Sequence, residues 1–175
     1  MSAQPSSLKA RALRYLAMRE HSRAELTRKL MQHVRRQQGA EAAETGEAGE
    51  EGEKAEAAEQ IRRVLDELAA AGFLSDERAA DALLAAQGRR MGSRRLQQTL
   101  QMRGLAPDLV RRTLNEARAT EYERALALWR RRFGAAPAAD AKALARQMRF
   151  LARRGFDGDV IRRVVKAGAL DEPSG

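Results

Sequence analysis

The feature that most constrains the fold of this chain is a short basic segment that occurs three times. The copies read IRRVL at 61–65, VRRTL at 110–114 and IRRVV at 161–165, and they lie 49 and 51 positions apart. Each copy has a β-branched residue, two arginines and then two mostly aliphatic residues. Such spacing arises by chance or because the chain consists of three copies of one structural unit.

The flanking residues favour the three-unit interpretation. RGLAPDLVRRTL at 103–114 aligns with RGFDGDVIRRVV at 154–165 without a gap, and Leu100 aligns with Leu151. In the first copy Leu26 aligns with Leu96 at an offset of 70, whereas Ile61 aligns with Val110 at an offset of 49. The first unit therefore carries an insertion of 21 residues between its second and third helices.

Composition and apolar spacing indicate an all-α protein. Ala, Arg, Leu and Glu dominate, only 4% of residues are aromatic, and no stretch alternates apolar and polar residues as a strand would. We predict three tandem three-helix, helix-turn-helix-like repeats that stack into an elongated, curved array of nine helices. The predicted repeats cover 6–72, 73–119 and 120–168, and a flexible tail covers 169–175.

The insertion is acidic in a basic chain. Residues 37–59 contain eight Glu and one Lys, so this segment carries −7 and the rest of the +9 chain carries +16. Like charge and low hydrophobicity predict a disordered or weakly helical loop over about 37–57, with helix possible in its last third. The remainder is basic enough to indicate a polyanionic or acidic protein partner.

Helix-end signals agree with the proposed units. Ser22 and Glu25 have the spacing of a capping box. Further signals are glycines at three expected helix stops, a proline at a first helical position and an aspartate before the last helix: Gly72, Gly104, Gly155, Pro107 and Asp157.

The sequence lacks the residues that several classes of protein function require. The chain has no cysteine, which excludes disulfides and thiolate metal sites, and its two histidines, His21 and His33, have no carboxylate cluster around them. There is no glycine-rich phosphate loop and no nucleophile–base arrangement. We therefore expect no enzyme activity, no cofactor and no metal, and a cytoplasmic, monomeric protein without a membrane partner.

The arginines are the strongest functional candidates. With the apolar positions of each third helix facing inward, the arginine pairs (Arg62–Arg63, Arg111–Arg112 and Arg162–Arg163) should face outward. Guanidinium groups bind phosphates and carboxylates equally well, so chemistry alone does not choose between DNA and an acidic protein groove. The predicted contact residues are Arg89, Arg90, Arg94, Arg95, Arg103, Arg111, Arg112, Arg153, Arg154, Arg162 and Arg163.

Taken together, these segments resemble the RecX family of bacterial regulators of the RecA recombinase. The matching pieces are ALRYLAMREHSRAELTRKL, IRRVLDELAAAGFLSDERAA, GSRRLQQTLQMRGL and FLARRGFDGDVIRRVV, which together span most of 8–166 outside the acidic insertion. The insertion and Ala80, where the family more often has an aromatic residue nearby, depart from the pattern. The resemblance implies binding along the groove of RecA filaments on single-stranded DNA. It also implies reduced ATP hydrolysis, strand exchange and co-protease activity, which would damp the SOS response.

Two other functions are compatible with the same residues. A helix-turn-helix transcription regulator would bind duplex DNA sequence-selectively and with strong salt dependence. A purely structural helical scaffold would have no nucleoprotein partner. Weak nonspecific binding to nucleic acid is expected in addition to binding to RecA.

Overall fold

The described part of the chain is entirely helical, as the sequence predicts. The computed structural model describes residues 7–45, 51–134 and 138–170, without the side chains of 40–45, 51 and 168–170. These residues form nine α-helices and one 3-10 turn, and they contain no strand. The helices are α1 Leu8–Met18, α2 Arg23–Thr45, α3 Glu51–Ala70, α4 Asp76–Gln87, α5 Ser93–Met102, α6 Pro107–Ala119, α7 Glu121–Phe133, α8 Ala141–Ala152 and α9 Gly158–Leu170, and the 3-10 turn η1 covers Gly88–Arg90.

Contacts divide the chain into two compact units. The first contains residues 1–79 together with 103–105, and the second contains 80–102 together with 106–175. None of the helices in the described ranges combines the length and apolarity needed to cross a membrane.

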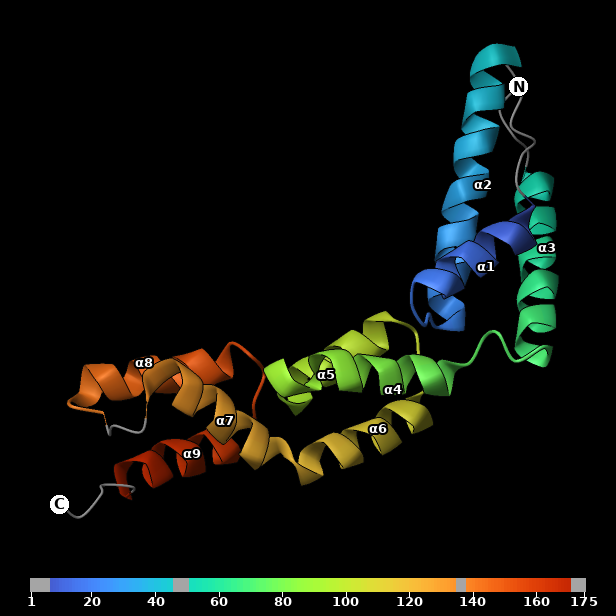
Figure 1. Ribbon diagram of the computed structural model, residues 1–175. Coiled ribbons are helices and arrows are strands. Elements are labelled where there is room, and N and C mark those ends of the chain that lie inside the picture. The colour runs from blue at the N-terminus through green and yellow to red at the C-terminus, as the bar shows by residue number, and fades with distance from the viewer. Residues whose placement is uncertain (1–6, 46–50, 135–137, 171–175) are drawn as a thin grey trace. The chain divides into compact units, whose positions relative to one another are not determined.

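The first unit is built on α1, α2 and α3, which pack against one another, with α2 and α3 side by side (Figure 1). Leu26, Leu30 and Ile61 are fully buried between them, and Leu65 and Leu68 are 1% exposed. These residues recur three or four positions apart, so each helix directs one apolar stripe inward. Burying each leucine contributes about 2 kcal/mol.

The described part of the acidic segment is helical, whereas the sequence predicts a disordered or weakly helical loop with helix possible in its last third. Helix α2 continues to Thr45 and α3 begins at Glu51, so the insertion lengthens two helices, and residues 46–50 lie outside the described part. Ala and Glu are strong helix formers, and a helix that already exists extends far more readily than a new one nucleates. Ala57 is also 8% exposed, so packing supports the last part of the segment.

The second unit has a separate core at its C-terminal end. Trp129 is 1% exposed and packs with Leu151, Phe156 and Val164 from α8, the following turn and α9. The indole Nε1 donates a hydrogen bond to Oε1 of Gln147 at 3.1 Å, which satisfies the one polar atom of the buried ring.

The helix-end signals are confirmed. Gly72, Gly104 and Gly155 have φ of +77°, +72° and +78°, a region that favours glycine. Pro107 is the first residue of α6, and the Asp157 side chain accepts a hydrogen bond from the backbone N–H of Asp159 at 3.1 Å. Because α9 continues to Leu170, the predicted tail begins within a helix, and its residues 171–175 lie outside the described part. The repeat boundaries stay a prediction.

Candidate basic site and the repeat junctions

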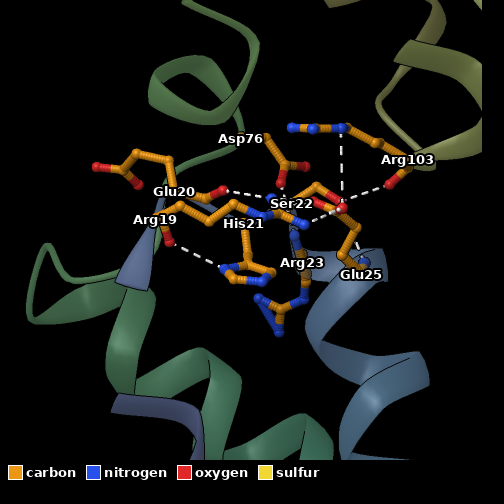
Figure 2. A network of polar contacts seen from close by, with 8 residues as sticks. All are labelled: Arg19, Glu20, His21, Ser22, Arg23, Glu25, Asp76 and Arg103. Atoms are coloured by element: carbon orange, nitrogen blue, oxygen red, sulfur yellow. Dashed lines mark hydrogen bonds and ion pairs between the residues drawn. The ribbon is translucent and has the colours of Figure 1, made fainter. Parts of the chain in front are cut away.

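The start of α2 is fixed by the predicted capping box. The Ser22 backbone N–H donates to Oε2 of Glu25 at 3.0 Å, and the Glu25 backbone N–H donates to the Ser22 Oγ at 3.1 Å. Both residues also contact more distant parts of the first unit (Figure 2). The Ser22 hydroxyl donates to the carbonyl of Arg103, and the Asp76 side chain accepts from the backbone N–H of Arg23 at 2.8 Å.

Glu25 is the electrostatic centre of this network. Arg19 donates to its carboxylate at 2.9 Å, and the Arg103 guanidinium lies 3.7 Å away. Burial by itself raises the pKa of Glu25, but the hydrogen bonds from Arg19 and Ser22 and the charge of Arg103 outweigh it and lower the pKa. Burial also lowers the pKa of Arg103, and the neighbouring Glu25 partly offsets this effect.

A related junction occurs inside the second unit. The backbone N–H of Gly92, which aligns with Ser22, donates to the carbonyl of Arg154 at 2.9 Å. Arg103 and Arg154 each precede a glycine with positive φ. An Arg–Gly turn therefore contacts the N-terminus of α2 in the first junction and the N-terminus of α5 in the second. A Cβ on Gly155 would lie 2.5 Å from the Arg95 backbone nitrogen, and this close approach therefore requires glycine.

A buried carboxylate completes the second junction. Glu121, the first residue of α7, is 3% exposed and accepts hydrogen bonds from the Ser93 backbone N–H at 2.9 Å and from the Ser93 hydroxyl. It also accepts from the backbone N–H of Asp157 at 3.2 Å. Asp76, the first residue of α4, has the equivalent role for Arg23. Each carboxylate satisfies an amide donor at a helix N-terminus and opposes the positive end of its dipole.

The second unit brings four predicted arginines around one pocket of about 470 Å³. This arginine pocket is lined by Arg90 from η1, Arg95 from α5 and Arg153 and Arg154 from the turn after α8, together with Ala86, Gln87 and Met91. None of the four arginines forms an ion pair with a carboxylate of the described residues. Their positive charge is therefore not neutralised within that part of the chain.

Contacts with neutral groups orient the walls of the arginine pocket. The Arg154 guanidinium lies 3.8 Å from the centre of the Phe150 ring and donates to the Phe150 carbonyl at 3.1 Å. Arg124 donates to the carbonyls of Gly88 and Met91, which lie on either side of Arg90 in the sequence. Burial lowers the pKa of Arg124, and the nearby Glu121 and Glu123 partly offset this shift.

The arginine pairs are exposed, as predicted, but their first members are neutralised locally. Arg111 pairs with Asp108 at 2.7 Å and Arg162 pairs with Asp159, in each case three residues earlier on the same helix. Arg62 likewise pairs with Glu59. The guanidinium of Arg163 lies 4.6 Å from the centre of the Tyr122 ring. Such exposed ion pairs contribute little stability and exchange readily for other partners.

The remaining candidates occupy different environments. Arg89 is exposed on η1, and exposed Arg94 lies 3.7 Å from a carboxylate oxygen of Asp157. Arg103 and Arg154 are half-buried in the two Arg–Gly turns, and all the other predicted contact arginines are exposed. In the described ranges, no three His, Asp or Glu side chains group in a way that could hold a metal ion.

Comparisons with known proteins agree with this architecture. Residues 119–165 match the domain described as "RecX, third three-helix domain", and residues 9–33 match "RecX, first three-helix domain". The "Regulatory protein RecX" of Leptothrix cholodnii is 46% identical over 160 residues, which cover 91% of this chain and 88% of that protein. The chain belongs to the RecX family.

Other RecX proteins support the assignment over nearly the full length. The "Regulatory protein RecX" of Chromobacterium violaceum is 38% identical over 172 residues, covering 98% of this chain and 97% of that protein. The crystal structure of RecX from Lactobacillus salivarius superposes with a TM-score of 0.62 at 16% identity, covering 91% of this chain and 92% of that one. This last similarity concerns the fold alone.

The contact residues predicted from the sequence of this RecX-family chain do not include the neutral and acidic residues around the arginines. Met91 and Phe150 carry no functional signature in the sequence, because one is a common core residue and the other lies at ordinary helical spacing. Glu121 could have been found, since aligning SDER at 75–78 with TEYER at 120–124 places it on Asp76. A carboxylate at the first position of both helices is a detectable signal.

Proposed function

We propose that this chain regulates the RecA recombinase by binding along the groove of RecA filaments on single-stranded DNA. The contacts are made by the exposed arginines of the predicted second and third repeats. Binding reduces ATP hydrolysis, strand exchange and co-protease activity, and so damps the SOS response. Membership of a family of regulatory proteins supports a regulatory rather than a catalytic role.

The observation that carries this proposal is the set of arginines without carboxylate partners in the second unit. Arg90 and Arg153 are exposed, and neither forms an ion pair within the described residues. A nucleoprotein filament presents both phosphates and acidic side chains, and guanidinium groups bind each of them. Exposed arginines can therefore reach several groups along such a filament.

The test is RecA ATP hydrolysis on single-stranded DNA while the full chain is titrated in. We expect inhibition well below one copy per RecA protomer, because a ligand that bridges protomers also affects neighbours that it does not contact. Binding to the same DNA without RecA is measured in parallel. Inhibition only at concentrations that saturate the free DNA would indicate competition for the strand and would contradict the proposal.

A second outcome would favour the helix-turn-helix regulator instead. That function requires tight, sequence-selective binding to duplex DNA, with an affinity that falls steeply as salt increases. If RecA hydrolysis is unchanged and such duplex binding is found, the transcription regulator replaces the RecA regulator.

A further inference from the structure

We infer that the arginine pocket is a phosphate-binding site with its own ligand, separate from the arginine pairs. The inference rests on the proposed function, because it assigns phosphate recognition in the proposed complex to Arg90, Arg95, Arg153 and Arg154. Its ligand class is a phosphate oxyanion. The source is either the backbone of a single nucleic-acid strand or the polyphosphate of a free nucleoside triphosphate.

The charge distribution separates the pocket from the arginine pairs. Arg62, Arg111 and Arg162 each have a carboxylate three residues earlier, within ion-pair distance. The four pocket arginines have no such partner among the described residues, although they come from three different elements. Concentrating unneutralised like charge around one hollow is unfavourable without a ligand, and an anion relieves the repulsion.

The pocket is also organised before any ligand arrives. Phe150 holds the Arg154 guanidinium through its ring face and its carbonyl, neither of which neutralises the charge. Nη1 of Arg95 lies 3.5 Å from the Arg153 carbonyl, and the Arg94 backbone N–H donates to the Gly155 carbonyl at 3.0 Å. Arg95 and Arg154, held in this way, lose little side-chain entropy on binding, so more of their interaction energy appears as affinity.

The number of guanidinium groups around the pocket and the shape of the two possible ligands favour phosphate over carboxylate. A planar carboxylate accommodates one guanidinium fork well, whereas the non-bridging oxygens of a phosphate accept from several donors around a tetrahedral centre. The volume of about 470 Å³ lies in the range typical of small-molecule sites. Buried Met91 and the neighbouring Ala86 add an apolar surface for the sugar or base that a phosphate carries.

The test is fluorescence anisotropy of a labelled oligothymidylate strand with the full chain and no RecA. The informative variant is R90A/R153A, because both side chains are exposed and neither has a partner whose loss would disturb the fold. The matched control is R118A/K142A, which also removes two exposed positive charges from the second unit but lies outside the pocket. Far-UV circular dichroism verifies that both variants keep wild-type helicity.

We expect R90A/R153A to weaken strand binding at least about tenfold, and R118A/K142A to weaken it less than about threefold. The slope of log affinity against log salt should fall by about one to two in the pocket variant. R90K/R153K keeps the charge but loses the guanidinium forks, so it should recover only part of the affinity. Equal weakening by the pocket variant and the control would overturn the inference, because it would indicate nonspecific attraction.

Competition between ATP and the labelled strand identifies the source of the phosphate. If ATP displaces the strand from the wild-type chain and binds R90A/R153A more weakly, the pocket takes free nucleotides. If ATP does not displace the strand while the R90A/R153A defect persists, the pocket takes backbone phosphates. If R90A/R153A loses binding to a poly-glutamate peptide but binds the strand like wild type, the pocket recognises acidic protein and the inference is wrong.

The inference and the proposed function can fail independently. Pocket-dependent strand binding by a chain that leaves RecA hydrolysis unchanged would refute RecA regulation and leave the phosphate site standing. Inhibition of RecA by the wild-type chain, with strand binding that is unaffected in R90A/R153A, would refute the phosphate site and leave the regulator standing.

Discussion

Glu121 lies against the N-terminus of α5, where its carboxylate accepts a hydrogen bond from the Ser93 backbone N–H at 2.9 Å. The same side chain accepts from the Ser93 hydroxyl and from the Asp157 backbone N–H, so one buried carboxylate joins α7, α5 and the start of α9. The arginine pocket lies between two of these segments, since Arg95 is on α5 and Arg153 lies just before the turn to α9.

Replacing Glu121 with Ala should lower the free energy of unfolding by about 3 kcal/mol, because it leaves buried donors without an acceptor. Unfolding in urea can be followed by the fluorescence of Trp129, the only tryptophan, which reports on the core of the second unit. Glu123 is exposed on the same helix turn, and Glu123→Ala should cost less than about 1 kcal/mol. Similar losses in both variants would mean that Glu121 contributes only helix-end charge.

The close contact between Gly155 and α5 predicts a difference in stability between two glycine-to-alanine variants. Gly155→Ala must adopt a positive φ and also place a Cβ 2.5 Å from the Arg95 backbone nitrogen, so it should cost about 3 kcal/mol or more. Gly72 has φ of +77° but nothing within 4 Å of its Cβ position, and Gly72→Ala should cost about 1 kcal/mol. Urea unfolding followed by far-UV circular dichroism measures both. Equal losses would show that the contact with α5 adjusts without cost.

The helices and the apolar cores could be predicted from the sequence because both depend on local periodicity. Leu26, Leu30 and Ile61 recur at helical spacing and are fully buried. The same local reasoning underestimated the helix in the acidic segment, because it gave repulsion between glutamates more weight than the extension of α2 and α3. Packed helices on either side supply the nuclei that an isolated acidic peptide would lack.

The arginine pocket could be predicted only in part, for a geometric reason. Each of its four arginines was a candidate, but their convergence depends on hydrogen bonds such as those that Glu121 makes with residues 28 and 36 positions away. Periodicity within a helix carries no information about which helix ends meet. The apolar wall at Met91 was missed for the same reason.

The lowered pKa of Glu25 predicts that the stability of the first unit depends on pH. Its pKa in the folded chain lies below the ordinary value of 4.5, because the hydrogen bonds and nearby arginines outweigh burial. The unfolded chain therefore takes up a proton at higher pH than the folded chain. The stabilisation by Glu25 is complete above about pH 4.5 and is lost as the pH falls through the lower, folded pKa.

Comparison with Glu25→Gln isolates this contribution. At pH 7 the variant should be less stable than wild type by about 1 kcal/mol, a value that allows for solvent screening of partly exposed Arg19. The difference should stay constant above about pH 6 and shrink below pH 4.5. Urea unfolding followed by far-UV circular dichroism at several pH values measures it, and a difference that persists unchanged to pH 3 would contradict the assignment.

The arginine pairs supply the most direct test of the proposed contact surface. Reversing all four charges in R111E/R112E/R162E/R163E should weaken inhibition of RecA hydrolysis at least about tenfold, which corresponds to about 1.4 kcal/mol of binding free energy. These side chains are exposed on α6 and α9, so far-UV circular dichroism should show unchanged helicity. If the quadruple variant inhibits RecA like the wild-type chain, the proposed surface is the wrong one.

The first repeat provides the matched control, because Arg62 and Arg63 occupy the same repeat position but lie outside the second and third repeats, to which the proposal assigns the contacts. R62E/R63E should therefore be compared with R111E/R112E and with R162E/R163E, each of which reverses two charges. Placing glutamates beside Glu59 lowers the stability of α3 slightly through like-charge repulsion, but RecA inhibition should stay within about twofold of wild type. An equal loss in all three double variants would mean that total charge, and not the surface of the second and third repeats, determines binding.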